Sequence, residues 1–137
     1  MLKFEKKAVG ILGGSFDPPH RGHVEISKIS LQKIGINKII WIITKKNPFK
    51  KKTFFSLKQR IQKSKNILKG LKKIEVLYLD DKIKSSRMIN VVNYLRNTMN
   101  QKDLYLILGS DNLLRFHKWT SWKKIVKLTK LFVFSRK

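Results

Sequence analysis

The stretch AVGILGGSFDPPHRGHVEISKISLQKIG, residues 8–35, decides the fold of this 137-residue chain. It opens with a short apolar run, residues 8–12, of the kind that forms a fully buried strand. From Gly22, apolar residues recur at helical spacing until Gly35, a residue type that suits the left-handed end of a helix. Glycines, two consecutive prolines and two histidines lie between them. We therefore predict a strand, a tight loop and a helix in direct succession.

The rest of the chain continues this alternation. Further buried strands are predicted over residues 38–44, 74–80, 103–111 and 131–135. Further helices are predicted over residues 56–68, 86–99, 112–119 and 121–129, the first with a capping box formed by Ser56 and Gln59. Five such strands separated by helices indicate an α/β fold, a doubly wound, Rossmann-like parallel sheet with helices on both faces. Ligands of such sheets bind beyond the carboxyl ends of the strands.

Length and composition set the class of protein. At 137 residues with 42% hydrophobic residues, we expect one folded domain over residues 1–137. No apolar run is long enough to cross a bilayer, so no membrane partner is expected, and the first residues lack the pattern of a secretory signal. The absence of cysteine excludes disulfides and thiolate metal sites. A cytoplasmic location is the expectation.

The formal net charge of +24 has two explanations. It could be an electrostatic footprint for nucleic acid or for small polyanions such as nucleotides. However, the excess consists of 26 lysines against 6 arginines, spread from end to end among isoleucines and asparagines. Such a mixture is typical of codon drift in an AT-rich genome, whereas nucleic-acid readers concentrate arginine on one face. We favour drift and do not expect nucleic acid as a partner.

The loop after the first strand suits a phosphate group. Gly13 and Gly14 let the main chain approach a ligand, and the N–H groups of residues 14–16 could bind phosphate oxygens. His20 and His23 lie three residues apart at a helix start, where a partial positive charge favours anions. The alternative is that both histidines only cap the helix, but their combination with the glycines and prolines favours a phosphate site. A metal site is less favoured because carboxylate and thiolate ligands are missing nearby.

The same loop carries a family resemblance. Residues 14–23, GSFDPPHRGH, resemble the G-x-F-D-P-x-H-x-G-H signature of the HxGH nucleotidyltransferase superfamily and, more narrowly, of the bacterial nicotinate-nucleotide adenylyltransferases. WIITKKNPFKKK, residues 41–52, resembles that family's strand and Pro-x-Asn-Pro-Leu-Lys loop. LGSDNLLRFHKWTSW, residues 108–122, resembles its Gly-x-Asp and Phe-His-x-Trp-x-x-Trp segment, and residues 131–137 resemble the strand that follows. The resemblance covers essentially the whole chain.

The resemblance implies a reaction: AMP passes from ATP to nicotinate mononucleotide, giving deamido-NAD and pyrophosphate in NAD biosynthesis, with Mg²⁺ present. His20 and His23 would be the catalytic residues, stabilising charge on the ATP phosphates. The other ATP-binding residues it implies are Gly14, Ser15, Phe16 and Lys50. The residues it implies for nicotinate mononucleotide are Gly109, Asp111, Trp119, which would stack on the ring, and Ser86. Because the acceptor phosphate is already an anionic nucleophile, no general base is required.

Other motif residues are expected to have structural roles. We expect Trp122 to pack in the core and His117 to be structural. Arg60, in the capped helix, is interpreted as an ion-pair partner. Asp17 is expected to fix its turn by binding main-chain N–H groups rather than a metal.

Two departures from the family pattern leave alternatives open. Where the family has a Thr-Tyr-Thr-x-Asp-Thr helix start beside the pyridine nucleotide, this chain has SSRMINVV, residues 85–92, in which Ser86 replaces one hydroxyl. The family's later Ser-Ser-Thr-x-x-Arg motif does not occur before Lys137, so mononucleotide binding is expected to survive better than turnover. The alternatives are another acceptor, such as nicotinamide mononucleotide or phosphopantetheine, and a catalytically impaired basic module that binds nucleotides or nucleic acid. The tryptophan segment argues against phosphopantetheine. The sequence does not indicate an oligomeric state.

Overall fold

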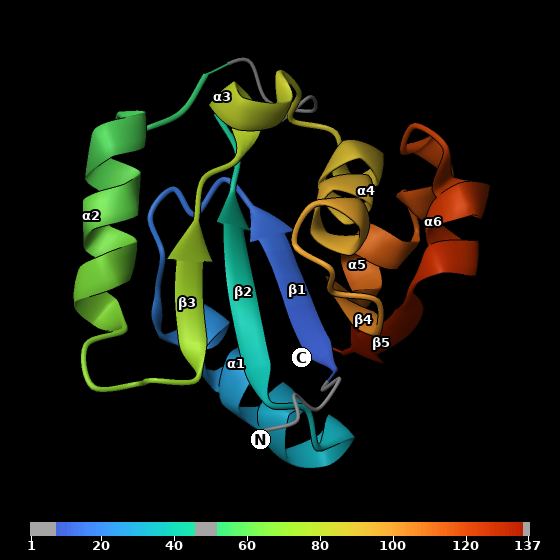
Figure 1. The fold of residues 1–137 in the computed structure, drawn as a ribbon. Helices are drawn as coiled ribbons and strands as arrows, with labels where there is room; N and C mark the ends of the chain where they lie inside the picture. Colours follow the sequence, from blue (N-terminus) through green and yellow to red (C-terminus); the bar gives the residue numbers. More distant parts are fainter. Residues whose placement is uncertain (1–7, 46–51, 136–137) are drawn as a thin grey trace.

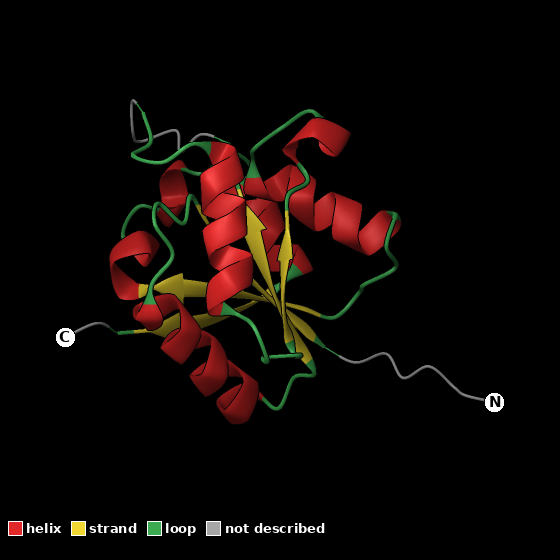
Figure 2. Cartoon of the chain, turned by 90° about the vertical axis from the view of Figure 1, so that its left-hand side faces the viewer, coloured by secondary structure: helices red, strands yellow, loops and turns green. Residues whose placement is uncertain are grey.

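The computed structural model describes residues 8–45 and 52–135, which form a parallel sheet with helices on both faces (Figures 1 and 2). The strands are β1 (Val9–Gly14), β2 (Lys38–Ile43), β3 (Ile74–Leu77), β4 (Leu104–Gly109) and β5 (Lys130–Phe134). Their order across the sheet is β3-β2-β1-β4-β5, and every neighbouring pair is parallel. The predicted doubly wound fold is confirmed.

The helices divide between the two faces. The longer ones are α1 (Arg21–Ile34), α2 (Leu57–Ile67), α4 (Met88–Asn97) and α6 (Trp122–Leu128). The side chains of α1 and α2 pack with Trp41 in one core, and those of α4 and α6 pack with Ile42 in the other. Residues on both sides of β2 are buried because side chains alternate between the faces of a strand. Within the described ranges, no helix is both long enough and apolar enough to cross a membrane.

Three short helices lie between the main elements: α3 (Asp80–Ile83), α5 (Ser110–Leu113) and η1 (Phe116–Lys118), a single turn of 3₁₀ helix. In Figure 1, α3 lies beyond the carboxyl ends of β2 and β3. α5 begins at the residue after β4 ends, so it lies at the same edge of the sheet. This edge is where ligands of doubly wound sheets bind.

The helix ends agree with the sequence. Gly35 has a φ of 75°, the left-handed conformation predicted for it, and its N–H bonds to the Leu31 carbonyl. Ser56 and Gln59 form the predicted reciprocal cap, with N···O distances of 3.0 and 3.1 Å. The predicted boundaries of α1 and α2 are therefore correct within about one residue.

The segment from 74 to 83 was predicted wrongly. The expected strand over residues 74–80 ends at Leu77, and Asp80 begins α3. The apolar alternation of IEVLYLD is typical of a strand, but β2 pairs with β3 only as far as Leu77. The two carboxylates that follow, Asp80 and Asp81, lie in the first turn of a helix, where negative charge is favourable. The single helix predicted over residues 112–119 is instead split into α5 and η1.

Candidate active site

The turn between β1 and α1 carries both motif histidines, and they cap the helix. The Gly22 N–H donates to His20 Nδ1, and the His20 N–H donates to His23 Nδ1, each at 3.0 Å. The two ring centroids are 4.0 Å apart. Because Nδ1 of each ring accepts a hydrogen bond, the neutral imidazole carries its proton on Nε2. The cap thus fixes both tautomers with Nε2 as the donor.

Gly22 is required by this arrangement. A Cβ atom at residue 22 would lie 2.8 Å from Cε1 and 2.9 Å from Nδ1 of His20. Both distances are shorter than any ordinary carbon contact, so a side chain at this position would displace the imidazole. Position 22 must therefore be glycine for the His20 ring to keep its place in the cap.

The ring of His23 packs against two core aromatic rings, those of Phe16 and Trp41, which we call the aromatic column. Phe16, with a φ of 51° and only 2% exposed, packs its ring on His23 at 4.7 Å and stacks on Trp41 at 4.8 Å. Trp41 Nε1 donates to Ser27 Oγ, which donates to the His23 carbonyl, both at 2.8 Å. Since the Phe16 side chain lies in the core, a contact from this residue to phosphate can come only from its main chain.

Asp17 binds main-chain N–H groups, as predicted, but they belong to another segment. Its carboxylate accepts hydrogen bonds from the N–H groups of Phe54 and Phe55, the latter at 2.7 Å. These residues precede α2 by sequence, so Asp17 joins the histidine turn to the start of that helix. The interaction is long-range and could not be read from local turn chemistry.

Arg60 differs from its predicted role. Its side chain is 1% exposed and donates to four main-chain carbonyls: those of Ser15, Thr44, Lys45 and Phe55, at 2.8–3.2 Å. Within residues 8–45 and 52–135 it forms no salt bridge. The expectation of an ion pair is therefore wrong, because the guanidinium N–H groups are satisfied by carbonyl oxygens just after β1 and β2 and just before α2.

The second group of predicted residues follows β4, which is the neighbour of β1 in the sheet. Gly109 ends the strand, and a Cβ atom there would lie 2.7 Å from Asp111 Oδ1. The exposed Asp111 therefore turns its carboxylate back towards the end of β4. Gly109 permits that close approach because it has no side chain.

Trp119 and Trp122 both pack against the ring of Phe116. Both are half-buried and meet the buried Phe116 ring edge-on, Trp119 at 5.1 Å and Trp122 at 6.0 Å. The predicted packing of Trp122 in the core is confirmed. Trp119 combines an anchored ring with partial exposure, which is compatible with stacking on a ligand. His117, on η1, is exposed.

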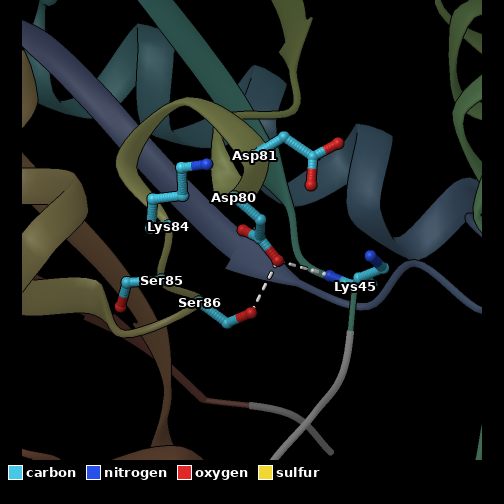
Figure 3. Close-up of a pocket in the computed structure, with 6 residues that line it drawn as sticks. All are labelled: Lys45, Asp80, Asp81, Lys84, Ser85 and Ser86. Carbon is cyan, nitrogen blue, oxygen red and sulfur yellow. Dashed lines mark hydrogen bonds between the residues drawn. The ribbon is translucent and has the colours of Figure 1, made fainter.

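A pocket of about 460 Å³ lies at the carboxyl ends of β2 and β3 (Figure 3). The residues that line it are Lys45, Asp80, Asp81, Lys84, Ser85 and Ser86. Ser86, the predicted acceptor-binding residue, donates its hydroxyl to Asp80 Oδ2 at 2.6 Å. The structure thus places Ser86 in a pocket, but together with an aspartate that the sequence analysis did not select. Lys50 lies outside the described residues.

Comparison with known proteins agrees with this geometry. A family model described as cytidylyltransferase-like matches residues 11–137. A protein of Pelagibacter ubique named a probable nicotinate-nucleotide adenylyltransferase is 44% identical over 135 residues, covering 98% of this chain and 74% of that protein. This chain belongs to the nicotinate-nucleotide adenylyltransferase family. A relative of the same name in Nitratiruptor is 36% identical, covering 94% of this chain and 73% of the relative.

The fold of this chain is also similar to that of solved adenylyltransferase structures. The nicotinic acid mononucleotide adenylyltransferase of Plasmodium falciparum complexed with NaAD superposes with a TM-score of 0.73 at 18% identity. The match covers 95% of this chain and 75% of that one. The same enzyme complexed with APC gives a TM-score of 0.74 at 17% identity. At such identities the likeness establishes the fold that this adenylyltransferase family shares.

Sequence reasoning about the adenylyltransferase motifs missed Asp80. One signal was present: an acidic residue at the end of a predicted strand, in a chain with only 8 acidic residues, stands at the sheet edge where ligands bind. It was counted as part of the strand instead. Arg60 was selected but given the wrong partners, because the sequence does not show which main-chain carbonyl groups a side chain will bind.

Proposed function

We propose that this chain transfers AMP from ATP to nicotinate mononucleotide, releasing pyrophosphate and forming deamido-NAD. Its membership of the nicotinate-nucleotide adenylyltransferase family supports the reaction. The observation that carries the proposal is the reciprocal cap of His20 and His23 at the start of α1, in which both Nδ1 atoms accept a main-chain N–H and Nε2 is left as the donor of each ring. Two fixed N–H donors beside the positive end of a helix suit the phosphates of ATP.

On the ATP side, His20 and His23 would donate to phosphate oxygens as the α-phosphorus is attacked. The main-chain N–H groups of Gly14, Ser15 and Phe16 would line the turn that receives the phosphates, and Lys50 would reach the triphosphate from the next loop. Donors held in place before the reaction stabilise developing charge without reorganisation. The aromatic column beneath His23 supplies that rigidity.

The chemistry is an in-line displacement. A phosphate oxygen of the mononucleotide forms a bond to the α-phosphorus of ATP while the bond to the pyrophosphate oxygen breaks, and pyrophosphate departs with that electron pair. The nucleophile is already an anion, so no residue needs to remove a proton. Catalysis then rests on positioning and on neutralising charge.

On the acceptor side, we propose that Gly109, Asp111, Trp119 and Ser86 bind nicotinate mononucleotide. Trp119 has the partly exposed ring needed for stacking, and Gly109 lets the Asp111 carboxylate lie against the end of β4. Ser86 lies in the pocket beside the ends of β2 and β3. Both groups follow the carboxyl ends of strands in the same sheet, Ser86 on the side of β2 and β3 and the others after β4, with β1 between them.

Mg²⁺ would enter with ATP. In the part of the chain that the structure describes, no three histidine or acidic side chains gather as a metal site. Mg²⁺ would therefore be held chiefly by the phosphate oxygens of ATP and by water, since this ion commonly takes few protein ligands. Bound there, it would neutralise charge on the triphosphate. We propose the cytoplasm as the compartment, since the chain has no cysteine that would point to an oxidising one.

The test is release of pyrophosphate from ATP and Mg²⁺ with a panel of acceptors: nicotinate mononucleotide, nicotinamide mononucleotide and phosphopantetheine. Wild-type protein should react best with nicotinate mononucleotide. His20→Ala should lower the rate by about 10²-fold or more, because it removes a donor to the transition state. His117→Ala, which removes an exposed histidine outside the cap, is the matched control.

Other outcomes identify the alternatives. A preference for another acceptor would retain adenylyl transfer but replace the substrate. No pyrophosphate with any acceptor, together with steeply salt-dependent binding to RNA or DNA that His20→Ala leaves unchanged, would favour a basic binding module.

A further inference from the structure

Asp80 lines the pocket at the carboxyl ends of β2 and β3, and the proposed reaction has not yet used it. Its side chain is 6% exposed, and a single oxygen, Oδ2, accepts both the Lys45 N–H at 2.7 Å and the Ser86 hydroxyl at 2.6 Å (Figure 3). The other oxygen, Oδ1, is buried without a hydrogen-bond partner among the described residues. A buried carboxylate with so few partners is costly to stability.

The two groups that Asp80 binds come from different segments. Lys45 follows the end of β2, and Ser86 precedes α4, whereas Asp80 itself begins α3. One carboxylate oxygen therefore fixes the distance between two walls of the pocket. Both bonds are short and one partner is charged, which makes them stronger than neutral hydrogen bonds.

Arg60 binds the main chain of Lys45 as well, through the carbonyl group of that residue. Its guanidinium binds the carbonyls of Lys45, Thr44 and Ser15 at 2.8–3.1 Å, while Asp80 binds the Lys45 N–H. A continuous series of hydrogen bonds thus runs from Ser15, in the ATP turn, to Ser86, in the pocket. The main chain of Lys45 lies at the centre of this series, because its carbonyl binds Arg60 and its N–H binds Asp80.

The bond to Lys45 requires a residue other than proline at position 45. When Asn47, Pro48 and Lys50 are matched to the family's Pro-x-Asn-Pro-Leu-Lys loop, Lys45 occupies the position of the first proline. Proline has no N–H, so a chain that follows the family pattern could not donate this hydrogen bond to a carboxylate.

We propose that Asp80 is a positioning residue for the acceptor: by holding the Lys45 main chain and the Ser86 hydroxyl together, it sets the shape of the pocket that binds the mononucleotide. The inference rests on the proposed function, since it assigns the pocket to the acceptor of that reaction. Asp80 acts through Lys45 and Ser86 rather than by touching the reacting atoms. Its loss should raise the KM for nicotinate mononucleotide while leaving the KM for ATP and kcat close to their original values.

Lys45→Pro and Lys45→Ala form a matched pair. Both remove the ammonium group, but only proline removes the N–H that Asp80 accepts. Relative to Lys45→Ala, Lys45→Pro should raise the acceptor KM by about tenfold or more, with the ATP KM unchanged between the two. Asp80→Ala should have a similar effect. Asp80→Asn, which keeps an oxygen acceptor of the same shape, should lie between Asp80→Ala and wild type.

A double variant separates positioning from general damage. If Asp80 acts through the Lys45 N–H, Lys45→Pro combined with Asp80→Ala should raise the acceptor KM no further than the worse single variant. Thermal unfolding of each variant establishes that the protein is folded at the assay temperature. Equal acceptor KM values for Lys45→Pro and Lys45→Ala, or equal increases for both substrates, would overturn the proposal while leaving the proposed function intact. A wild-type protein that neither turns over nor binds nicotinate mononucleotide by calorimetry would overturn both.

Discussion

His20 has two roles in this account, and His20→Asn separates them. Its Nδ1 accepts the Gly22 N–H and caps α1, whereas its Nε2 would donate to phosphate. Asparagine is among the best helix-capping residues, so it can keep the first role. Its shorter side chain cannot place a donor where Nε2 lies. We therefore expect a stable protein in which adenylyl transfer is slowed by about 10²-fold or more.

The magnitudes make the two roles distinguishable. Loss of a cap, as in His20→Ala, costs about 1 kcal/mol. From a typical stability of about 5–15 kcal/mol, that leaves an unfolded fraction of about 0.1% or less. Loss of one transition-state donor instead lowers kcat by about 10²–10³-fold. Unfolding therefore cannot account for the loss of turnover that we expect, even in the less stable variant.

Urea unfolding and pyrophosphate release should be measured on wild type, His20→Ala and His20→Asn. We expect His20→Asn to lie within about 0.5 kcal/mol of wild type in free energy of unfolding, yet to be as inactive as His20→Ala. Retained turnover in His20→Asn would refute the reasoning, because the imidazole would then be no more than a cap.

Three further predictions follow from single contacts. Gly22→Ala should lower kcat by about tenfold or more with little change in melting temperature, because the new Cβ displaces the His20 ring while alanine favours the helix; unchanged kcat would contradict this. Arg60→Lys should reduce the free energy of unfolding by roughly 2–5 kcal/mol in urea, because a single ammonium cannot satisfy the carbonyls that the guanidinium binds. Burial and a hydrogen bond to Asp81 raise the pKa of Tyr78 above 10.0, so the stability linked to its neutral form is present below pH 10 and is lost as pH rises through the raised value. Asp81→Asn should move that pKa back towards 10.0 in an absorbance titration of phenolate, and no movement would remove Asp81 as a cause.

The sheet and its long helices could be predicted because each depends on local pattern. Buried strands read as β-branched runs, and Gly35 and Ser56 mark helix ends by their own conformational preferences. The β3–α3 junction could not be predicted in this way. Tyr78 and Leu79 extend the apolar alternation, but pairing with β2 ends at Leu77, and partner strands are decided by tertiary structure.

The candidate site was predictable in its parts but not in its connections. The histidine loop was found because glycines, prolines and histidines rarely combine by chance between a strand and a helix. That both histidines cap the helix through Nδ1 follows from two main-chain hydrogen bonds that no sequence pattern records. Asp17, Arg60 and Asp80 all bind main-chain groups of segments that are distant in the sequence, with 15–45 residues between the partners. Such partners become visible only once the fold brings them together.

A crystal structure of the protein with a non-hydrolysable ATP analogue and Mg²⁺ tests the central claim most directly. The account predicts phosphate oxygens within hydrogen-bond distance of Nε2 of both His20 and His23, with each Nδ1 still accepting its main-chain N–H. Phosphates bound elsewhere, or imidazoles that turn their Nε2 atoms into the protein when the nucleotide binds, would contradict it.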